Sequence, residues 1–327
     1  MYVIVDYIVG VDGGASKTVA LIATEDGKIV GRGRSGSSNY HNVGSTSAGE
    51  AIRAAVHQAL SKAHLTWKEL AVAVVALAGI DSSRDVKEAR RFVRLANISM
   101  QSFVAHDSVS ALYAATRGGP GIIVNSGTGS FAAGINKHGQ YARAGGWGYI
   151  IGDEGSAFDI GRMALAASFR MLDGRVKPTA LRNALRKYFH VNTLEDAMFI
   201  VYRSKIDDVA RLSPIVSRLA PSDETCRRVL EAAGFELAGL ACAVARRLKM
   251  MQDTFPVLAT GGGFKSGPYL VRPFSKTIHT ECPRARISIL RTEPVRGALM
   301  LAFCKLQEQK RVKVKDFVIV RDVLHLA

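Results

Sequence analysis

Two stretches of the chain follow the same plan, in which an apolar run, a glycine-rich loop, a second apolar run and a turn succeed one another. In the first stretch the loop reads DGGASKT over residues 12–18 and lies between apolar runs at residues 8–11 and 19–23. In the second the loop reads NSGTGS over residues 125–130, again between two short apolar runs. Paired apolar runs around a tight loop predict strand hairpins. Because the plan occurs twice, we expect a fold built from two similar halves.

Each loop can present several backbone N–H groups and hydroxyl donors to one anion, as phosphate-binding loops do. The first loop is not a Walker loop, because Ser16 precedes Lys17 where that motif has glycine and because a strand pattern follows it. A tight turn between two strands explains a single loop of this kind equally well, since Gly, Ser and Thr are common in turns. The pair favours two hairpins that grip the phosphates of one nucleotide.

Strand and helix patterns alternate in the first third of the chain. Buried strands are expected at residues 70–77 and 101–105, and helices follow each of them. Such alternation predicts a mainly parallel sheet, whose ligands lie at the carboxyl ends of the strands. Asp12, Gly79 and Asp107 each come directly after a predicted strand, so we expect these residues at one site.

The segment of residues 145–156 is rich in glycine and carries Trp147 and the acidic pair Asp153-Glu154. A glycine-rich turn with Asp153 near a helix N-cap is one interpretation. The other is a rim that offers carboxylates and an aromatic platform to a small polar ligand. Further along, three successive glycines at residues 261–263 follow a predicted strand and would let the backbone approach a flat ring or a sugar closely.

The remaining segments are expected to be structural. Residues 156–251 have a helical period with a few breaks, and we expect them to cover the core without chemistry of their own. The basic tail at residues 311–324 is expected to be an edge strand guarded by lysines and not a binding arm.

Composition narrows the class of protein. The chain has 327 residues, 48% of them hydrophobic, and a net charge of +16, which suggests about two domains and raises the question of nucleic acid. The basic residues are dispersed over polar helix faces, so we expect no nucleic-acid partner, although a basic surface would attract an anionic nucleotide.

The longest apolar run, residues 71–80, is too short to span a membrane, and the apolar start of the chain is expected to be a strand. Four cysteines without a metal or disulfide spacing favour a reducing compartment, so we expect a cytoplasmic protein.

With these motifs in this order, the sequence resembles the sugar kinases of the actin/hexokinase/Hsp70 superfamily. It is most similar to the BadF/BadG/BcrA/BcrD ATPase family, which includes N-acetylglucosamine kinase and archaeal hexokinases. The resemblance covers nearly the whole chain and implies an α/β, two-domain, actin-like ATPase (ribonuclease H-like) fold, with a cleft between duplicated domains and a helical insertion in the second. We expect residues 1–118 in the first domain, joined by residues from about 308 to 327, and residues 119–307 in the second, with the helical region at 156–251.

The resemblance also implies roles for individual residues in a kinase that uses ATP and Mg²⁺. Asp107 follows a strand end beside the second glycine-rich loop and is expected to be the catalytic base. Asp12 would hold Mg²⁺ through water. The expected phosphate-binding residues are Gly13, Gly14, Ser16, Lys17, Thr18, Gly127, Thr128 and Gly129. The expected adenosine-binding residues are Gly261, Gly262 and Gly263, and the expected sugar-binding residues are Asn39, Gly79, Trp147, Gly148, Asp153 and Glu154.

The resemblance leaves the acceptor open among N-acetylglucosamine, glucosamine and a hexose such as glucose, with phosphorylation expected at the 6-hydroxyl. It implies sugar and ATP as partners and a homodimer. An alternative within the same family is an ATPase that activates a 2-hydroxyacyl-CoA dehydratase through an iron–sulfur cluster. Such a cluster needs closely spaced thiolates, and the four cysteines lack that spacing.

Overall fold

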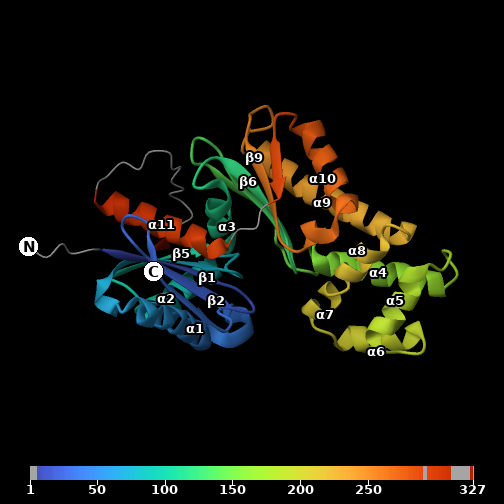
Figure 1. Cartoon of the computed structure of the whole chain (residues 1–327), viewed down its shortest axis with the longest axis horizontal. Helices are drawn as coiled ribbons and strands as arrows, with labels where there is room; N and C mark the ends of the chain where they lie inside the picture. Colours follow the sequence, from blue (N-terminus) through green and yellow to red (C-terminus); the bar gives the residue numbers. More distant parts are fainter. Residues whose placement is uncertain (1–5, 290–292, 311–324, 327) are drawn as a thin grey trace, which may run out of the picture. The chain divides into compact units, whose positions relative to one another are not determined.

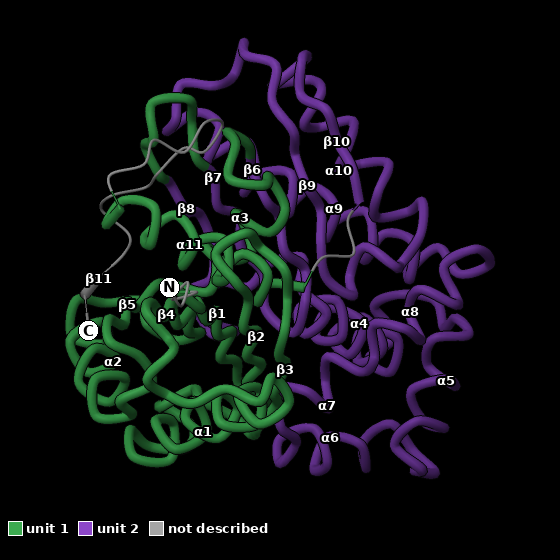
Figure 2. Tube along the Cα trace, turned by 60° about the vertical axis from the view of Figure 1, so that its left-hand side comes forward, with its two compact units in different colours: residues 1–121, 135–141, 292–327 green, residues 122–134, 142–291 purple. Residues whose placement is uncertain are grey.

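The computed structural model of the 327-residue chain describes residues 6–289, 293–310 and 325–326. The basic tail at residues 311–324, predicted to be an edge strand, lies outside the described residues. The chain separates into two compact units (Figure 2). Unit 1 comprises residues 1–121, 135–141 and 292–327, and unit 2 comprises residues 122–134 and 142–291. The division that the sequence predicts, with residues 119–307 in the second domain, stays a prediction.

The sheet of unit 1 has its strands in the order β11-β5-β4-β1-β2-β3. Strands β1, β4 and β5 run parallel, whereas β2 pairs antiparallel with both β1 and β3. Strand β4 reads LAVAVVAL and is buried almost throughout, as expected for a central strand covered on both faces. The strands are β1 (Tyr7–Gly13), β2 (Thr18–Thr24), β3 (Ile29–Ser35), β4 (Leu70–Leu77), β5 (Gln101–His106) and β11 (His325–Leu326).

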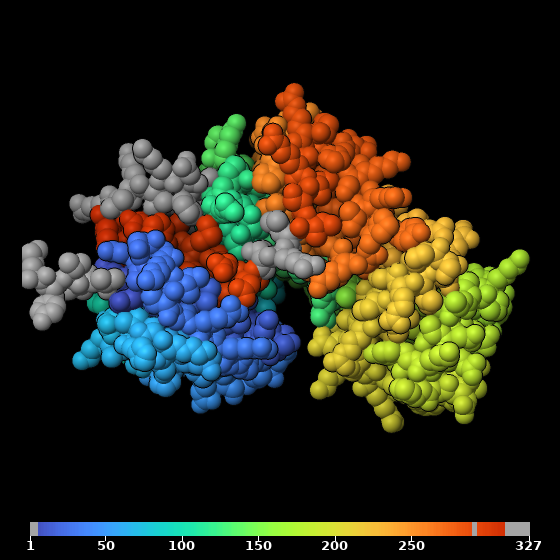
Figure 3. Space-filling model, viewed as in Figure 1, coloured from blue at the N-terminus to red at the C-terminus, as the bar shows by residue number. Residues whose placement is uncertain are grey.

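Helices cover both faces of this sheet (Figure 1). Helices α1 (Tyr40–Ala63) and α2 (Ser83–Ala96) cover one face, and α3 (Asp107–Thr116) and α11 (Pro294–Gln309) cover the other. Gly10 in β1 lets α11 approach the strand, because a Cβ there would lie 2.2 Å from the backbone nitrogen of Leu299. Figure 3 shows the residues of α11, in red, packed against N-terminal residues in blue. Helix α11 therefore closes the core of unit 1 from a distant part of the sequence.

Helix α1 begins earlier than the sequence predicts. The pattern predicts a loop over residues 35–44 and a helix from residue 47, but residues 40–43 already form a helical turn before a kink at Gly44. The side chain of Asn39 caps this turn by accepting a hydrogen bond from the backbone N–H of His41 at 3.1 Å. Gly44 has a φ of 78°, which separates the short turn from the regular helix.

The second sheet, which lies almost entirely in unit 2, has the strand order β10-β9-β6-β7-β8, and β9 runs parallel to both β6 and β10. A series of helices between β8 and β9 packs into the large hydrophobic core of this unit. Within the described residues no helix combines the length and the apolar composition needed to cross a membrane. The strands are β6 (Gly121–Ser126), β7 (Ser130–Ile135), β8 (Tyr141–Gly145), β9 (Pro256–Thr260) and β10 (Arg286–Ile289). The helices are α4 (Ala157–Leu172), α5 (Ala180–Phe189), α6 (Leu194–Arg203), α7 (Ile206–Ala210), α8 (Ser213–Leu219), α9 (Glu224–Arg247) and α10 (Pro268–Glu281), with the 3₁₀ turn η2 (Gly263–Ser266) after β9.

Candidate active site

The carboxyl ends of three parallel strands meet at one edge of the sheet in unit 1. Strand β1 ends at Gly13 beside Leu77 of β4, and Leu77 in turn lies beside His106 of β5. Asp12, Gly79 and Asp107 therefore lie at one edge, as the strand order predicts. Asp107 is close enough to Asp12 for its negative charge to raise the pKa of Asp12.

Asp12 is an unusual carboxyl group. Burial, and after it the negative charge of Asp107, raises its pKa from 3.8 to about 7, although Lys17 acts in the opposite direction. A cation bound beside Asp12 would relieve this cost. Mg²⁺ in phosphoryl-transfer sites is held by one or two carboxylates, by water and by substrate phosphates, and Asp12 fits that donor set. In the part of the chain that the structure describes, no group of three or more His, Cys, Asp and Glu is placed to hold a metal.

The first glycine-rich loop joins β1 to β2 and presents its middle residues to solvent. The backbone N–H of Gly14 donates to the carbonyl of Lys17 at 2.9 Å, which closes the turn, and Ser16 and Lys17 are exposed. Thr18 is buried instead, and its hydroxyl donates to the carbonyl of Gly36 at 2.8 Å and to the Ser38 hydroxyl at 2.9 Å. Of the predicted phosphate-binding residues here, Ser16 and Lys17 can reach a ligand, while Thr18 holds the loop from inside.

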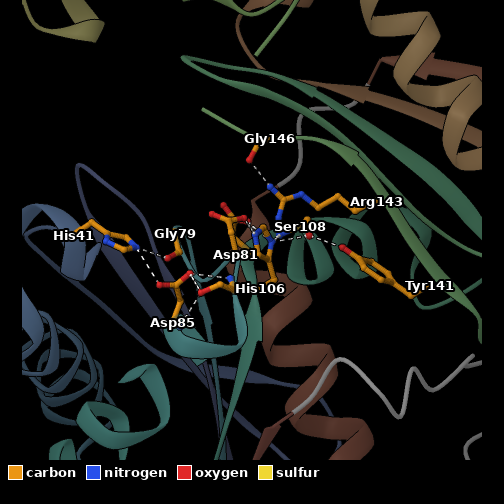
Figure 4. Close-up of polar contacts among 11 residues, drawn as sticks. His41, Gly79, Asp81, Asp85, His106, Ser108, Tyr141, Arg143 and Gly146 are labelled. Carbon is orange, nitrogen blue, oxygen red and sulfur yellow. Dashed lines mark hydrogen bonds and ion pairs between the residues drawn. The ribbon is translucent and has the colours of Figure 1, made fainter. Parts of the chain in front are cut away.

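Two of the expected sugar-binding residues lie together in unit 1. A Cβ on Gly79, whose φ is 80°, would lie 3.1 Å from the side-chain amide of Asn39. His41 joins them, since its Nε2 lies 3.0 Å from the Gly79 carbonyl and 3.5 Å from Asp85 (Figure 4). The sequence reasoning missed His41, which lies two residues beyond Asn39 in the predicted loop and is half exposed.

In unit 2 the second glycine-rich loop is tied to the acidic pair. The backbone N–H of Ser130 donates to the Asp153 carboxylate at 3.0 Å, and the Ser130 hydroxyl donates to the carbonyl of Glu154 at 2.6 Å. Gly129 is required here, because a Cβ would lie 2.9 Å from the carboxylate oxygens of Asp153. Burial raises the pKa of Asp153, and the hydrogen bond from Ser130 opposes that shift. Asp153 therefore supports the loop, and only its remaining hydrogen-bonding capacity is open to a ligand.

Trp147 and Gly148 lie in an exposed segment of unit 2. The Trp147 side chain is 65% exposed, which leaves its ring accessible as a platform. The Arg143 guanidinium lies over that ring at 5.9 Å. It also donates to the carbonyl of Gly146 at 2.6 Å (Figure 4). Gly148 has a φ of 83°, which favours glycine.

A pocket of about 710 Å³ lies wholly within unit 2. The second glycine-rich loop contributes Gly127 and Thr128, and the turn after β9 contributes Gly262. The other two glycines of that turn pack inward, because a Cβ on Gly261 would lie 2.2 Å from the Ser126 carbonyl oxygen and one on Gly263 would lie 1.9 Å from its hydroxyl. The structure thus brings the second loop and the late glycines together around one pocket, with Gly262 alone of the three lining it.

The opposite wall of the pocket comes from helices α7 and α8, which the sequence reasoning missed. Asp207, Arg211 and Ser213 line the pocket, and the Thr128 hydroxyl donates to Asp207 at 3.2 Å. Lys265 in η2 adds a second cation to the lining. The expectation that residues 156–251 only cover the core is therefore too narrow. One signal was present in the sequence, since Pro214 suits the first turn of a helix and stands there in α8, close to these polar residues.

Comparisons with known proteins identify the family of the chain. The model of the BadF/BadG/BcrA/BcrD ATPase family matches residues 9–302. The chain is 31% identical to the N-acetylmuramic acid/N-acetylglucosamine kinase of Clostridium acetobutylicum over 90% of this chain and 98% of that protein. It is 30% identical to the N-acetyl-D-glucosamine kinase of Dictyostelium discoideum over 91% of this chain and 98% of that protein.

A solved structure shares the fold. A protein from Chromobacterium violaceum, named as a candidate N-acetylglucosamine kinase, matches with a TM-score of 0.76 and 27% identity over 92% of this chain and 100% of that chain. Together with the two sheets and their glycine-rich hairpins, this similarity confirms the predicted α/β, actin-like ATPase fold class.

Proposed function

Because the chain belongs to the BadF/BadG/BcrA/BcrD ATPase family, we propose that it is an ATP-dependent sugar kinase. It transfers the γ-phosphoryl group of ATP to a hydroxyl of N-acetylglucosamine, glucosamine or a hexose such as glucose, with the 6-hydroxyl as the expected acceptor. The observation that carries the proposal is the carboxyl pair Asp12 and Asp107 at the strand edge that also bears the exposed loop residue Lys17.

ATP binding is assigned to the two glycine-rich loops and the pocket of unit 2. In unit 1, Gly13 and Gly14 shape the loop, and the exposed Ser16 and Lys17 offer a hydroxyl and one cation to phosphate oxygens. In unit 2, Gly127, Thr128 and Gly129 form the second loop, beside a pocket whose volume of about 710 Å³ suits a nucleotide. The pocket cations Arg211 and Lys265 complement a polyphosphate. The late glycines, through Gly262, would lie against adenosine.

Asp107 is the proposed base. Phosphoryl transfer depends mainly on positioning and on neutralising charge, and a carboxylate accepts the proton of the attacking hydroxyl. Asp107 is the first residue of α3 and its side chain is 30% exposed, so a hydroxyl can reach it. Asp12 would hold Mg²⁺, which supplies positive charge to the phosphate oxygens when it is bound. Lys17 offers a further positive charge at the same edge.

In unit 1 the sugar is proposed to contact Asn39 and Gly79, which lie together. In unit 2 the proposed sugar-binding residues are Trp147, Gly148, Asp153 and Glu154. The names of the curated relatives support an N-acetylated amino sugar as the first acceptor to test. We further propose a homodimer and a cytoplasmic location, as the family resemblance implies. The four buried, unbridged cysteines are consistent with a reducing compartment.

A sugar panel tests the function directly. Release of ADP is measured with N-acetylglucosamine, N-acetylmuramic acid, glucosamine, glucose and no sugar, and the phosphorylated carbon is identified by NMR. We expect ADP release to depend on at least one sugar and the product to be a 6-phosphate. Strong ATP hydrolysis without any sugar, by a protein that carries iron, would instead favour the activator of a 2-hydroxyacyl-CoA dehydratase.

A further inference from the structure

His106 lies between two carboxylates at the end of β5 (Figure 4). Its Nε2 lies 3.0 Å from an Asp81 oxygen, and its Nδ1 lies 2.8 Å from Oδ1 of Asp107. The imidazole is only 17% exposed, so solvent screens these contacts weakly. The residue next to the proposed base is therefore a titratable ring with a carboxylate on each side.

The Nδ1 atom has two competing partners. The backbone N–H of Ser108 donates to Nδ1 at 3.0 Å, so His106 is the N-cap of α3, and this bond requires a lone pair on Nδ1. The contact with Asp107 would be favourable only if Nδ1 carried a proton. Oδ1 of Asp107 is buried and accepts no hydrogen bond within the residues that the structure describes. This is consistent with an Nδ1 that caps α3 and carries no proton. One nitrogen cannot serve the cap and the carboxylate at the same time.

The network fixes the neutral tautomer. With Nδ1 accepting from Ser108, the single ring proton is on Nε2 and points to Asp81. The Ser108 hydroxyl lies 2.7 Å from Nδ1 and 2.7 Å from the hydroxyl of Tyr141. The described contacts of the imidazole include Asp81 in the loop after β4, Asp107 and Ser108 in α3, and Tyr141 in β8 through Ser108. Asp12 is near enough to Asp107 to be affected by its charge.

We propose that His106 is a positioning residue for Asp107, whose neutral ring, held by Asp81, leaves the carboxylate ready to accept the sugar hydroxyl proton. A proton on Nδ1 removes the cap of α3 and places a positive charge 2.8 Å from Asp107. That charge stabilises the carboxylate anion and makes it a poorer proton acceptor. Transfer therefore slows as His106 becomes protonated. The inference rests on the proposed kinase function.

The test compares wild type with His106→Asn and Asp81→Asn. Asparagine retains a side-chain oxygen that can cap α3 but cannot titrate. The profile of kcat against pH is measured from pH 5 to 9 at saturating ATP, Mg²⁺ and sugar. Wild type is expected to lose at least about tenfold between the upper and the lower end of this range, which covers the titration of histidine, and His106→Asn less than about threefold. In Asp81→Asn the acid limb moves down by about one pH unit, because a neutral amide stabilises the imidazolium less.

The outcomes separate this inference from the proposed function. If wild type phosphorylates no sugar, the kinase proposal fails and the role of His106 fails with it. If wild type is active but the acid limb is the same in all three proteins, only the role of His106 is overturned, because a purely structural residue lowers the rate at every pH alike. Nitrogen-15 NMR of the histidine rings adds a measurement that does not depend on activity, and the signal that is missing in His106→Asn belongs to His106. A proton on Nδ1 at pH 8 would overturn the proposed tautomer. If His106→Asn does not fold, the pH profile of Asp81→Asn alone tests the role of His106.

Discussion

The carboxyl of Asp12 shows how a site residue can weaken the fold that carries it. Its neighbours on β1 are core residues, and the negative charge of Asp107 lies nearby. Transfer of a carboxylate from water to such a place is unfavourable unless a cation compensates it. Above pH 7, a pKa raised from 3.8 to about 7 corresponds to a cost of about 4 kcal/mol in the free energy of unfolding. Stability and metal binding therefore compete at this residue.

We predict that Asp12→Asn stabilises the protein in the absence of Mg²⁺ and nucleotide. Between pH 3.8 and 7 the native state holds a proton that the unfolded state releases, so the stability of wild type falls as the pH rises through this window. The variant has no such ionisation. Its advantage in urea denaturation should be larger at pH 8 than at pH 5 by about 2 to 3 kcal/mol. An advantage that does not change with pH would show that Asp12 titrates normally.

Asp107 should be needed for chemistry and not for nucleotide binding. We predict that Asp107→Asn lowers kcat by about 10² to 10⁴, the usual contribution of a general base, while the Kd for ATP changes less than about threefold. Turnover and calorimetric ATP binding measure the two quantities separately. Asp26→Asn is the control, since this acid lies in the exposed turn after β2. A mutant at residue 107 that keeps most of its turnover would remove Asp107 from the role.

At the scale of elements, the turn after β9 depends on close backbone packing. The Ser126 hydroxyl, at the end of β6, donates to the carbonyl of Gly155 at 2.8 Å and also occupies the space where a Cβ on Gly263 would lie. Strand β6 pairs with β9 up to this point. The second glycine-rich loop and the late glycines are thus held together by one buried serine.

We predict that Gly263→Ala lowers the thermal unfolding midpoint by several degrees, because the new methyl group displaces Ser126 and breaks its bond to Gly155, at a cost of about 1 to 3 kcal/mol. The matched variant is Gly262→Ala, where an added Cβ meets nothing within 4 Å and φ is −68°. Its midpoint should stay within about one degree of wild type or rise slightly. Equal losses in both variants would contradict the packing argument.

At the scale of the whole molecule, all four thiols are buried, although they come from distant segments and both units. Burial is the main cause that raises the pKa of Cys226, Cys242 and Cys304 to about 12. Burial also raises the pKa of Cys282. Thiols in this state are poor nucleophiles and poor metal ligands, because the thiolate is the reactive form. This argues against the alternative that needs an iron–sulfur cluster.

We predict that native protein at pH 8 reacts with a thiol reagent only as fast as it unfolds, whereas all four thiols react at once in concentrated guanidinium. The absorbance of the released reagent measures both rates. Ser222→Cys, on the exposed turn before α9, provides a thiol that should react within seconds in the native state. Prompt reaction of a wild-type thiol without denaturant would show that a cysteine is accessible.

The order of motifs and the local structure around each could be predicted from the sequence. Glycine-rich loops between strands and an acid directly after a strand depend on neighbours in the chain, so local patterns predicted the first loop, a mainly parallel sheet covered by helices and the position of Asp107 at a strand end. The actin-like fold class came from the family resemblance. Local patterns also have limits, as the early start of α1 at Tyr40 shows. There the polar residues by themselves predict a loop, whereas the side chain of Asn39 caps a helical turn.

Tertiary structure decided which residues share a site. Asp207 and Arg211 line the unit 2 pocket together with the second glycine-rich loop, which lies about 80 residues earlier in the chain. A local sequence pattern cannot predict a contact between such distant residues. The two carboxylates around His106 likewise come from separate elements. The sequence by itself determined the chemical groups and their order, because backbone preferences act over a few residues. Only packing of the sheets and helices decided which groups meet, since burial of apolar surface brings distant segments together.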